Sequence, residues 1–84
     1  MNISRNEQRV LHALAQGGAI RHDRDGDRII AATCFTREGH ALADFNLAVL
    51  ARLRRRGLVA SKGGQPYRIS PAGLRAVRAQ FDNR

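Results

Sequence analysis

Cationic side chains are concentrated between residues 52 and 68, where a basic helix is followed by a turn-rich segment. Closely spaced arginine and lysine can bind the phosphates of a nucleic acid or the carboxylates of an acidic protein. Cations in a last helical turn also offset the negative end of the helix dipole, but capping alone does not require so many. We therefore predict a binding surface for protein or DNA that consists of Arg52, Arg55, Arg56, Lys62, Gln65 and Arg68.

The sequence contains no arrangement of residues typical of an enzyme or a metal site. Cys34 and the three histidines never occur at the spacing of zinc ligands, and a single cysteine in an apolar strand is typical of packing. The aspartates after residue 22 suggest a calcium loop, but an EF-hand needs glycine where Arg28 stands and glutamate where Cys34 stands. Turn chemistry explains these aspartates better. We predict a non-enzymatic protein that acts by binding, without cofactor or metal.

The spacing of the apolar residues predicts the basic helix and its buried side. Its apolar side consists of Leu47, Val49, Leu50 and Leu53. The three arginines of the predicted binding surface fall on the opposite side, where we expect them to be dispensable for folding, and Arg54 falls at the edge. Asp44 is a suitable N-cap, and Gly57 is a suitable residue to end the helix.

Two apolar faces outside the basic helix allow further predictions about the core. In the strand 29–35, Thr33 prefers water, so we expect the opposite face to point to the core. That opposite face consists of Ile30, Ala32 and Cys34. The last helix carries an apolar stripe that could serve the core or a partner, which leaves the oligomeric state open. This stripe consists of Leu74, Val77 and Phe81.

Charge, length and element order together predict one small α+β domain over residues 1–84. Ser4 and Glu7 predict a capping box, and Ser70 with Pro71 predicts another helix start. A basic helix that runs directly into a hairpin is typical of winged-helix domains, so we predict a winged-helix-like fold with three helices and two β-hairpins. Its expected elements are a helix over 4–16, a hairpin over 19–35 with strands at 19–22 and 29–35, the basic helix over 45–56, a wing over 58–70 and a helix over 71–81.

The composition also indicates the cellular location of the protein and the charge of its partners. Fifteen Lys and Arg against seven Asp and Glu give a net charge of +8, which suits a polyanion or an acidic protein surface. The sequence has no run long enough to span a bilayer, no signal-peptide pattern and a single cysteine. We therefore expect a cytoplasmic protein without a membrane partner.

Short motifs over nearly the whole chain resemble the YjhX toxin family of small basic bacterial proteins. They are EQRVLH at residues 7–12, CFTREG at 34–39, PYRIS at 66–70, AVRAQ at 76–80 and DNR at 82–84. The resemblance implies a toxin that inhibits the bacterial type IA DNA topoisomerase, topoisomerase I, with an antitoxin protein as a further partner. It assigns no binding residues, so the predicted surface depends on the helix and the wing alone.

Two functions stay open at the level of sequence. An inhibitor could bind the topoisomerase, its DNA or the complex of the two. The alternative is a winged-helix transcriptional regulator whose basic helix enters the major groove of double-stranded DNA. The start of that helix offers Asn46 but few other side chains that could read bases, and the arginines lie near its end. We therefore favour contacts with protein or phosphate over sequence readout.

Overall fold

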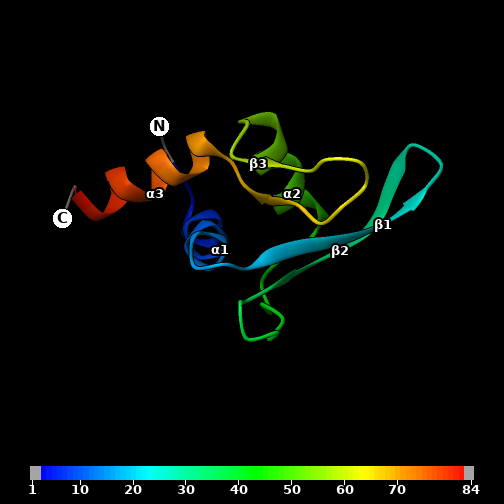
Figure 1. The fold of residues 1–84 in the computed structure, drawn as a ribbon, viewed down its shortest axis with the longest axis horizontal. Helices are drawn as coiled ribbons and strands as arrows, with labels where there is room; N and C mark the ends of the chain where they lie inside the picture. The colour runs from blue at the N-terminus through cyan, green and yellow to red at the C-terminus, as the bar shows by residue number, and fades with distance from the viewer. Residues whose placement is uncertain (1–2, 83–84) are drawn as a thin grey trace.

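The structure is a computed structural model that describes residues 3–82, with side chains up to residue 78. It consists of three helices and two antiparallel hairpins, which confirms the predicted α+β class (Figure 1). In chain order the elements are α1 (Arg5–Ala15), β1 (Ala19–Asp25), β2 (Arg28–Phe35), α2 (Leu47–Arg55), β3 (Val59–Ala60), β4 (Arg68–Ile69) and α3 (Pro71–Asp82).

Helix α1 begins with the predicted capping box. The Ser4 hydroxyl accepts the Glu7 amide at 3.1 Å, and Glu7 Oε1 accepts the Ser4 amide at 3.1 Å. After the helix, Gly17 has a φ of 109°, which favours glycine. At Gly18 a Cβ would lie 2.4 Å from the Phe35 carbonyl oxygen, so only glycine lets α1 and β2 approach this closely.

The β1–β2 hairpin contains a bulge that changes which residues face the core. Ala31 and Ile29 pair with consecutive residues of β1, so Ile30 between them is the extra residue. Ile30 is 53% exposed, whereas Ile29 packs against the core. We predicted that Ile30, Ala32 and Cys34 face the core. This is confirmed for Ala32 and Cys34 and is wrong for Ile30, because the bulge reverses the alternation of the strand.

Both strands of this hairpin extend further toward the turn than the sequence predicts. Strand β1 continues to Asp25 instead of ending at His22, and Asp25 pairs with Arg28 across a turn made by Gly26 and Asp27. Gly26 has a φ of 64°, as the favoured two-residue hairpin turns require. Asp and Gly disfavour strands in general, but pairing with the partner strand overrides that preference here.

Helix α2 begins at Leu47 instead of residue 45 and has a different N-cap from the predicted one. Asn46 Oδ1 accepts the Val49 amide at 3.0 Å. Asp44, the predicted cap, forms an ion pair with Arg9, with 2.8 Å between Arg9 Nη1 and Asp44 Oδ2. Leu47 is 40% exposed, so the expectation that it belongs to the buried side is wrong. It occupies the first helical position, at the edge of the structure rather than over the core.

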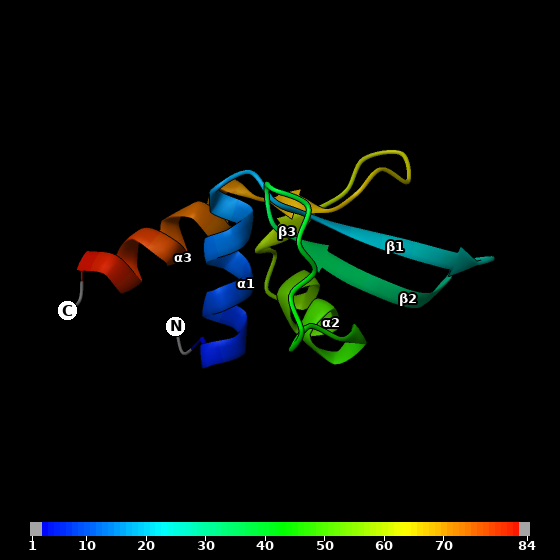
Figure 2. The same cartoon turned by 90° about the horizontal axis from the view of Figure 1, so that it is seen from below.

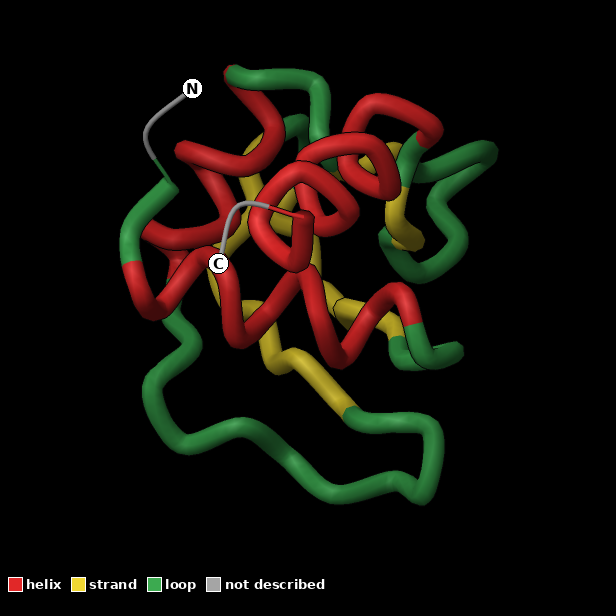
Figure 3. Tube along the Cα trace, turned by 90° about the vertical axis from the view of Figure 1, so that its left-hand side faces the viewer, coloured by secondary structure: helices red, strands yellow, loops and turns green. Residues whose placement is uncertain are grey.

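The loop between β2 and α2, residues 36–46, runs along the bottom of the view in Figure 3. Its start is held against β2 by backbone hydrogen bonds. The Thr36 amide donates to the His40 carbonyl at 2.8 Å, and the Leu42 amide donates to the Cys34 carbonyl at 2.9 Å. These bonds direct the chain from the end of β2 toward the start of α2.

The two hairpins are joined by one pair of hydrogen bonds. Ile20 and Tyr67 exchange backbone N–H···O bonds of 2.9 and 2.8 Å, which connect β1 to the chain entering β4. Helix α3 then begins as predicted, with Pro71 at its first position and the Gly73 amide donating to the Ser70 hydroxyl at 3.1 Å. From this start α3 leads away from the body of the molecule, diverging from α1 (Figure 2).

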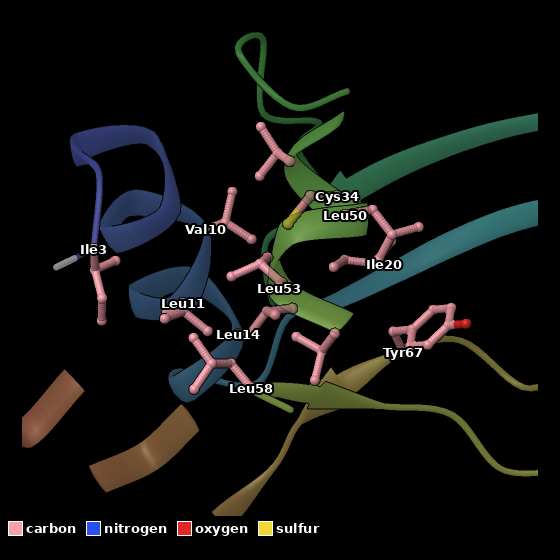
Figure 4. Close-up of a cluster of buried hydrophobic side chains, with 12 residues drawn as sticks. Ile3, Val10, Leu11, Leu14, Ile20, Cys34, Leu50, Leu53, Leu58 and Tyr67 are labelled. Carbon is pink, nitrogen blue, oxygen red and sulfur yellow. The ribbon is translucent and has the colours of Figure 1, made fainter. Parts of the chain in front are cut away.

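The core is built by α1, α2 and the two hairpins (Figure 4). Its buried residues are Ile3, Val10, Leu11, Leu14, Ile20, Cys34, Val49, Leu50, Leu53, Leu58, Val59 and Tyr67. Helix α3 contributes only partly buried side chains, among them Ala76 and Val77, within the part of it whose side chains are described. Of the predicted apolar stripe of this helix, Leu74 is 40% exposed, and the Phe81 side chain lies outside the described residues.

Leu53→Ala is expected to lower the free energy of unfolding by about 2–5 kcal/mol, because Leu53 is fully buried and the substitution leaves a cavity. Leu47→Ala is the matched control, since it removes the same atoms from an exposed position of the same helix. That control is expected to change stability by less than about 1 kcal/mol. Urea or thermal unfolding of both variants measures the difference, and equal losses would contradict the placement of the core.

Candidate functional site

Two of the predicted binding residues are tied to a carboxylate on another helix. Glu7 of α1 is only 2% exposed. Arg52 Nε lies 3.8 Å from Glu7 Oε1, and Arg56 Nη1 lies 3.6 Å from Glu7 Oε2. The side chains of Arg52 and Arg56 remain 41% and 36% exposed. These arginines therefore connect α1 to α2 while part of each still faces solvent.

The environment of Glu7 favours its ionised form. Burial by itself raises the pKa of Glu7, but the hydrogen bonds with Ser4 and the charges of Arg56 and Arg52 outweigh it, so the pKa lies below its ordinary value of 4.5. Glu7 Oε2 is buried and accepts no hydrogen bond from the residues that the structure describes. Its negative charge therefore depends on the arginines of α2, which gives Arg52 and Arg56 a structural task that the helix pattern alone does not reveal.

Arg55, Lys62 and Gln65 are exposed and differ from this pair. Neither Arg55 nor Lys62 has an ion-pair partner among residues 3–78, whose side chains the structure describes. Lys62 and Gln65 lie in the β3–β4 turn, where Gly63 and Gly64 have positive φ and the Gln65 amide donates to the Lys62 carbonyl at 3.1 Å. The turn thus presents these two side chains to solvent on a defined backbone.

Arg68 lies at the other end of α1 from Glu7. Its Nη1 is 3.3 Å from the Gly17 carbonyl oxygen and 3.4 Å from that of Gly18, so it binds the chain that leaves α1. Glu7 and Gly17 are separated by roughly 15 Å along a helix axis. The six predicted residues thus form two groups, one where α2 meets the start of α1 and one on the β3–β4 hairpin.

Arg28 and Arg54 are cations near α2 that the predicted surface does not include. Both border a hollow of about 280 Å³ between the β1–β2 hairpin and α2, whose lining also contains Ile29 and the exposed Leu47. The Arg54 guanidinium lies 5.7 Å from the centre of the Tyr67 ring, within the range of a cation–π contact. A helical wheel places Arg54 at the edge of the apolar stripe, but no sequence signal places Arg28 beside it.

The remaining reactive side chains have structural surroundings. Cys34 is buried, and this burial raises the pKa of its thiol to about 11, which makes it a poor nucleophile near neutral pH. His22 packs on Tyr67, with ring centres 4.9 Å apart. Within residues 3–82 no group of His, Cys, Asp or Glu could hold a metal ion, and no helix there has both the length and the apolar character to cross a membrane.

Comparison with known proteins gives the family. A sequence profile of the YjhX toxin family, described as "Putative toxin of bacterial toxin-antitoxin pair", matches residues 1–84. The chain belongs to this family. It is also 62% identical over 85 residues to a UPF0386 protein of Beijerinckia indica and 61% identical over 85 residues to one of Parvibaculum lavamentivorans, with both chains covered completely in each case.

The comparisons leave the winged-helix likeness as a prediction. No solved structure matches the chain. A UPF0386 protein of Brucella anthropi, 58% identical over 84 residues and covered completely, carries a name that states no activity. The family is thus described as a toxin rather than as an enzyme, and its description pairs it with an antitoxin.

Glu7→Gln is expected to lower the free energy of unfolding by about 1–2 kcal/mol at neutral pH, a value reduced by the partial exposure of the arginines. Glutamine can retain the capping hydrogen bonds, so the variant isolates the charge. Because folding lowers the pKa of Glu7, its contribution is present above pH 4.5 and is lost as the pH falls through the lower pKa of the folded state. The difference between the melting temperatures of the two proteins should therefore shrink as the pH is lowered below 4.5.

Arginine variants provide the control for this ion pair. Arg52→Ala combined with Arg56→Ala should destabilise the protein at pH 7 because Glu7 is left buried without a counter-charge. Arg55→Ala removes the same side chain from the same helical turn and should leave the melt within a few degrees of the parent. A loss with Arg55→Ala that equals the loss with the double variant would argue against a specific role of Glu7.

Proposed function

We propose that the protein is a non-enzymatic toxin that inhibits bacterial type IA DNA topoisomerase by binding the enzyme or its complex with DNA. The toxin role is supported by the family to which the chain belongs. The topoisomerase target comes from the resemblance to that family. Binding occurs through the exposed cations of α2 and the β3–β4 hairpin.

The observation that carries this proposal is that exposed cations of the predicted surface have no acidic partner. Arg55 and Lys62 are exposed and have no acidic partner among the side chains of residues 3–78. The net charge of the chain is +8. Such side chains favour a phosphate or carboxylate partner and increase the rate of encounter with a negatively charged one.

Arg52 and Arg56 support the same function although they contact Glu7. A guanidinium has five N–H donors, and contacts of 3.6–3.8 Å with a carboxylate leave donors that can face a ligand. The ion pairs restrict two long side chains before binding, which lowers the conformational entropy that binding would cost. Glu7 therefore prepares these arginines for a partner.

Protein or phosphate contacts are favoured over sequence readout by the first half of α2. Its exposed residues there are Leu47, Ala48 and Ala51, which have no hydrogen-bonding side chains. Asn46 Oδ1 is already used as the N-cap acceptor. A recognition helix of a transcriptional regulator would need polar side chains in this region to distinguish base pairs.

In a plasmid-relaxation assay with a type IA topoisomerase, the protein is expected to inhibit relaxation near a one-to-one ratio to enzyme. Arg55→Ala combined with Lys62→Ala should weaken inhibition at least about tenfold, which corresponds to 1.4 kcal/mol. The matched control, Arg24→Ala with Arg75→Ala, removes two exposed cations from elsewhere and should inhibit normally. Inhibition that disappears with excess competitor DNA would indicate masking of the template and overturn binding to the enzyme.

Binding to duplex DNA is expected to be independent of sequence and strongly dependent on salt. If Arg52, Arg55, Arg56, Lys62 and Arg68 all meet phosphates, log K should fall against log salt with a slope of about −4 to −5. Fluorescence anisotropy with two unrelated duplexes measures both properties. A slope near zero would exclude these residues as a phosphate-binding surface, and strong preference for one duplex would favour a transcriptional regulator.

A further inference from the structure

A groove of about 300 Å³ lies between α1 and α3, on surfaces that the basic residues of α2 do not share. Its apolar lining consists of Ile3, Leu11, Ala76 and Val77. Ala76 and Val77 are only partly buried, so these two side chains of α3 leave the groove partly open. Figure 2 shows the cause, because α3 starts beside one end of α1 and diverges from it toward its own end.

The α1 side of this groove is basic. Arg5, Arg9 and His12 line it and follow one another at four- and three-residue spacing, which places them along one face of the helix. None of the lining residues whose side chains the structure describes is acidic. Arg5 is exposed and forms no ion pair with the described side chains, which end at residue 78, whereas Arg9 contacts Asp44. An apolar floor beside cations complements a segment with apolar anchors flanked by carboxylates.

We propose that the α1–α3 groove binds an acidic amphipathic helix of the antitoxin. Apolar side chains of that helix enter between α1 and α3, and its glutamates or aspartates meet Arg5 and Arg9. This is the helix-in-groove mode of recognition, with anchors repeated every three or four residues. The proposal rests on the description of the family as one half of a toxin–antitoxin pair and is independent of the topoisomerase target.

The positive charge of the groove favours an acidic helix over a second copy of the same chain as its occupant. Each copy carries +8, and the groove itself is basic, so two copies meeting there would repel each other. The groove is at the lower end of the volume range of ligand pockets and is partly open to solvent. It therefore suits a few side chains of a partner helix better than an enclosed small molecule.

The groove and the α2 surface come from different elements. The groove residues belong to α1, α3 and the segment before α1, whereas Arg55 and Lys62 belong to α2 and the β3–β4 hairpin. Substitutions can therefore separate the two activities. A toxin altered in the groove should escape its antitoxin and still act on its target.

Arg5→Glu is the variant that tests the groove with little risk to folding. Arg5 is the first residue of α1, where a negative charge interacts favourably with the helix dipole. Arg75→Glu is the matched control, because it makes the same charge change on the exposed surface of α3 outside the groove. Both variants keep the same net charge, so non-specific attraction falls equally in the two proteins.

The probe is a synthetic helical peptide of about 18 residues, long enough to form a helix, with leucines along one face and glutamates on both flanks. We expect saturable binding to the full chain by fluorescence anisotropy. Arg5→Glu should weaken it at least about tenfold, because like charges then face each other at the rim, whereas Arg75→Glu should change it less than about twofold. Amide shifts on binding should concentrate at residues 3–12 and 76–77.

Each alternative result overturns the proposal. If Arg5→Glu and Arg75→Glu weaken peptide binding equally, the interaction depends only on net charge and not on the groove. Equal binding of a peptide whose leucines are replaced by serine would exclude the apolar groove. Sedimentation as a dimer that the peptide dissociates would assign the groove to a second copy. Arg5→Glu should still inhibit relaxation, and failure of the unmodified protein to inhibit would overturn only the topoisomerase target.

Discussion

The contact on which this small domain depends is the nearly buried carboxylate of Glu7. One of its oxygens completes the capping box of α1, and the carboxylate as a whole faces Arg52 and Arg56 of α2. A charge in this position is costly unless it is balanced, so the start of α1 and the end of α2 stabilise each other. The apolar residues of both helices then meet in the core beneath this contact.

This arrangement divides the cations of the protein into two kinds. Some are engaged within the fold, as Arg9 is with Asp44 and Arg68 is with the carbonyls that follow α1. Others, such as Arg55 and Lys62, are exposed without an acidic neighbour in the described chain. A chain with fifteen basic residues thus uses part of its charge for contacts within the fold and leaves part of it without an acidic neighbour among the described residues. The net charge alone does not show this division.

A toxin that is controlled by an antitoxin has to meet two partners, and a domain of this size has little surface to divide between them. The structure offers an exposed basic region on α2 and the β3–β4 hairpin, and an apolar groove where α3 diverges from α1. Their separation on different elements would let the antitoxin hold the protein without covering all of its cations. The partial burial of Ala76 and Val77 is consistent with a helix whose apolar face is completed by another molecule.

Local signals in the sequence determined the elements. The capping box at Ser4, the N-cap and proline at the start of α3 and the glycines of the turns act over a few residues, so helices, hairpins and the α+β class were predictable. Contacts between distant residues were decided only by the tertiary structure. Asp44 reaches Arg9 and leaves the cap to Asn46, and the bulge exposes Ile30. The pairing of Glu7 with two arginines that a helical wheel assigns to solvent likewise requires α1 and α2 to be packed together, because spacing along one helix carries no information about the charge that its neighbour presents.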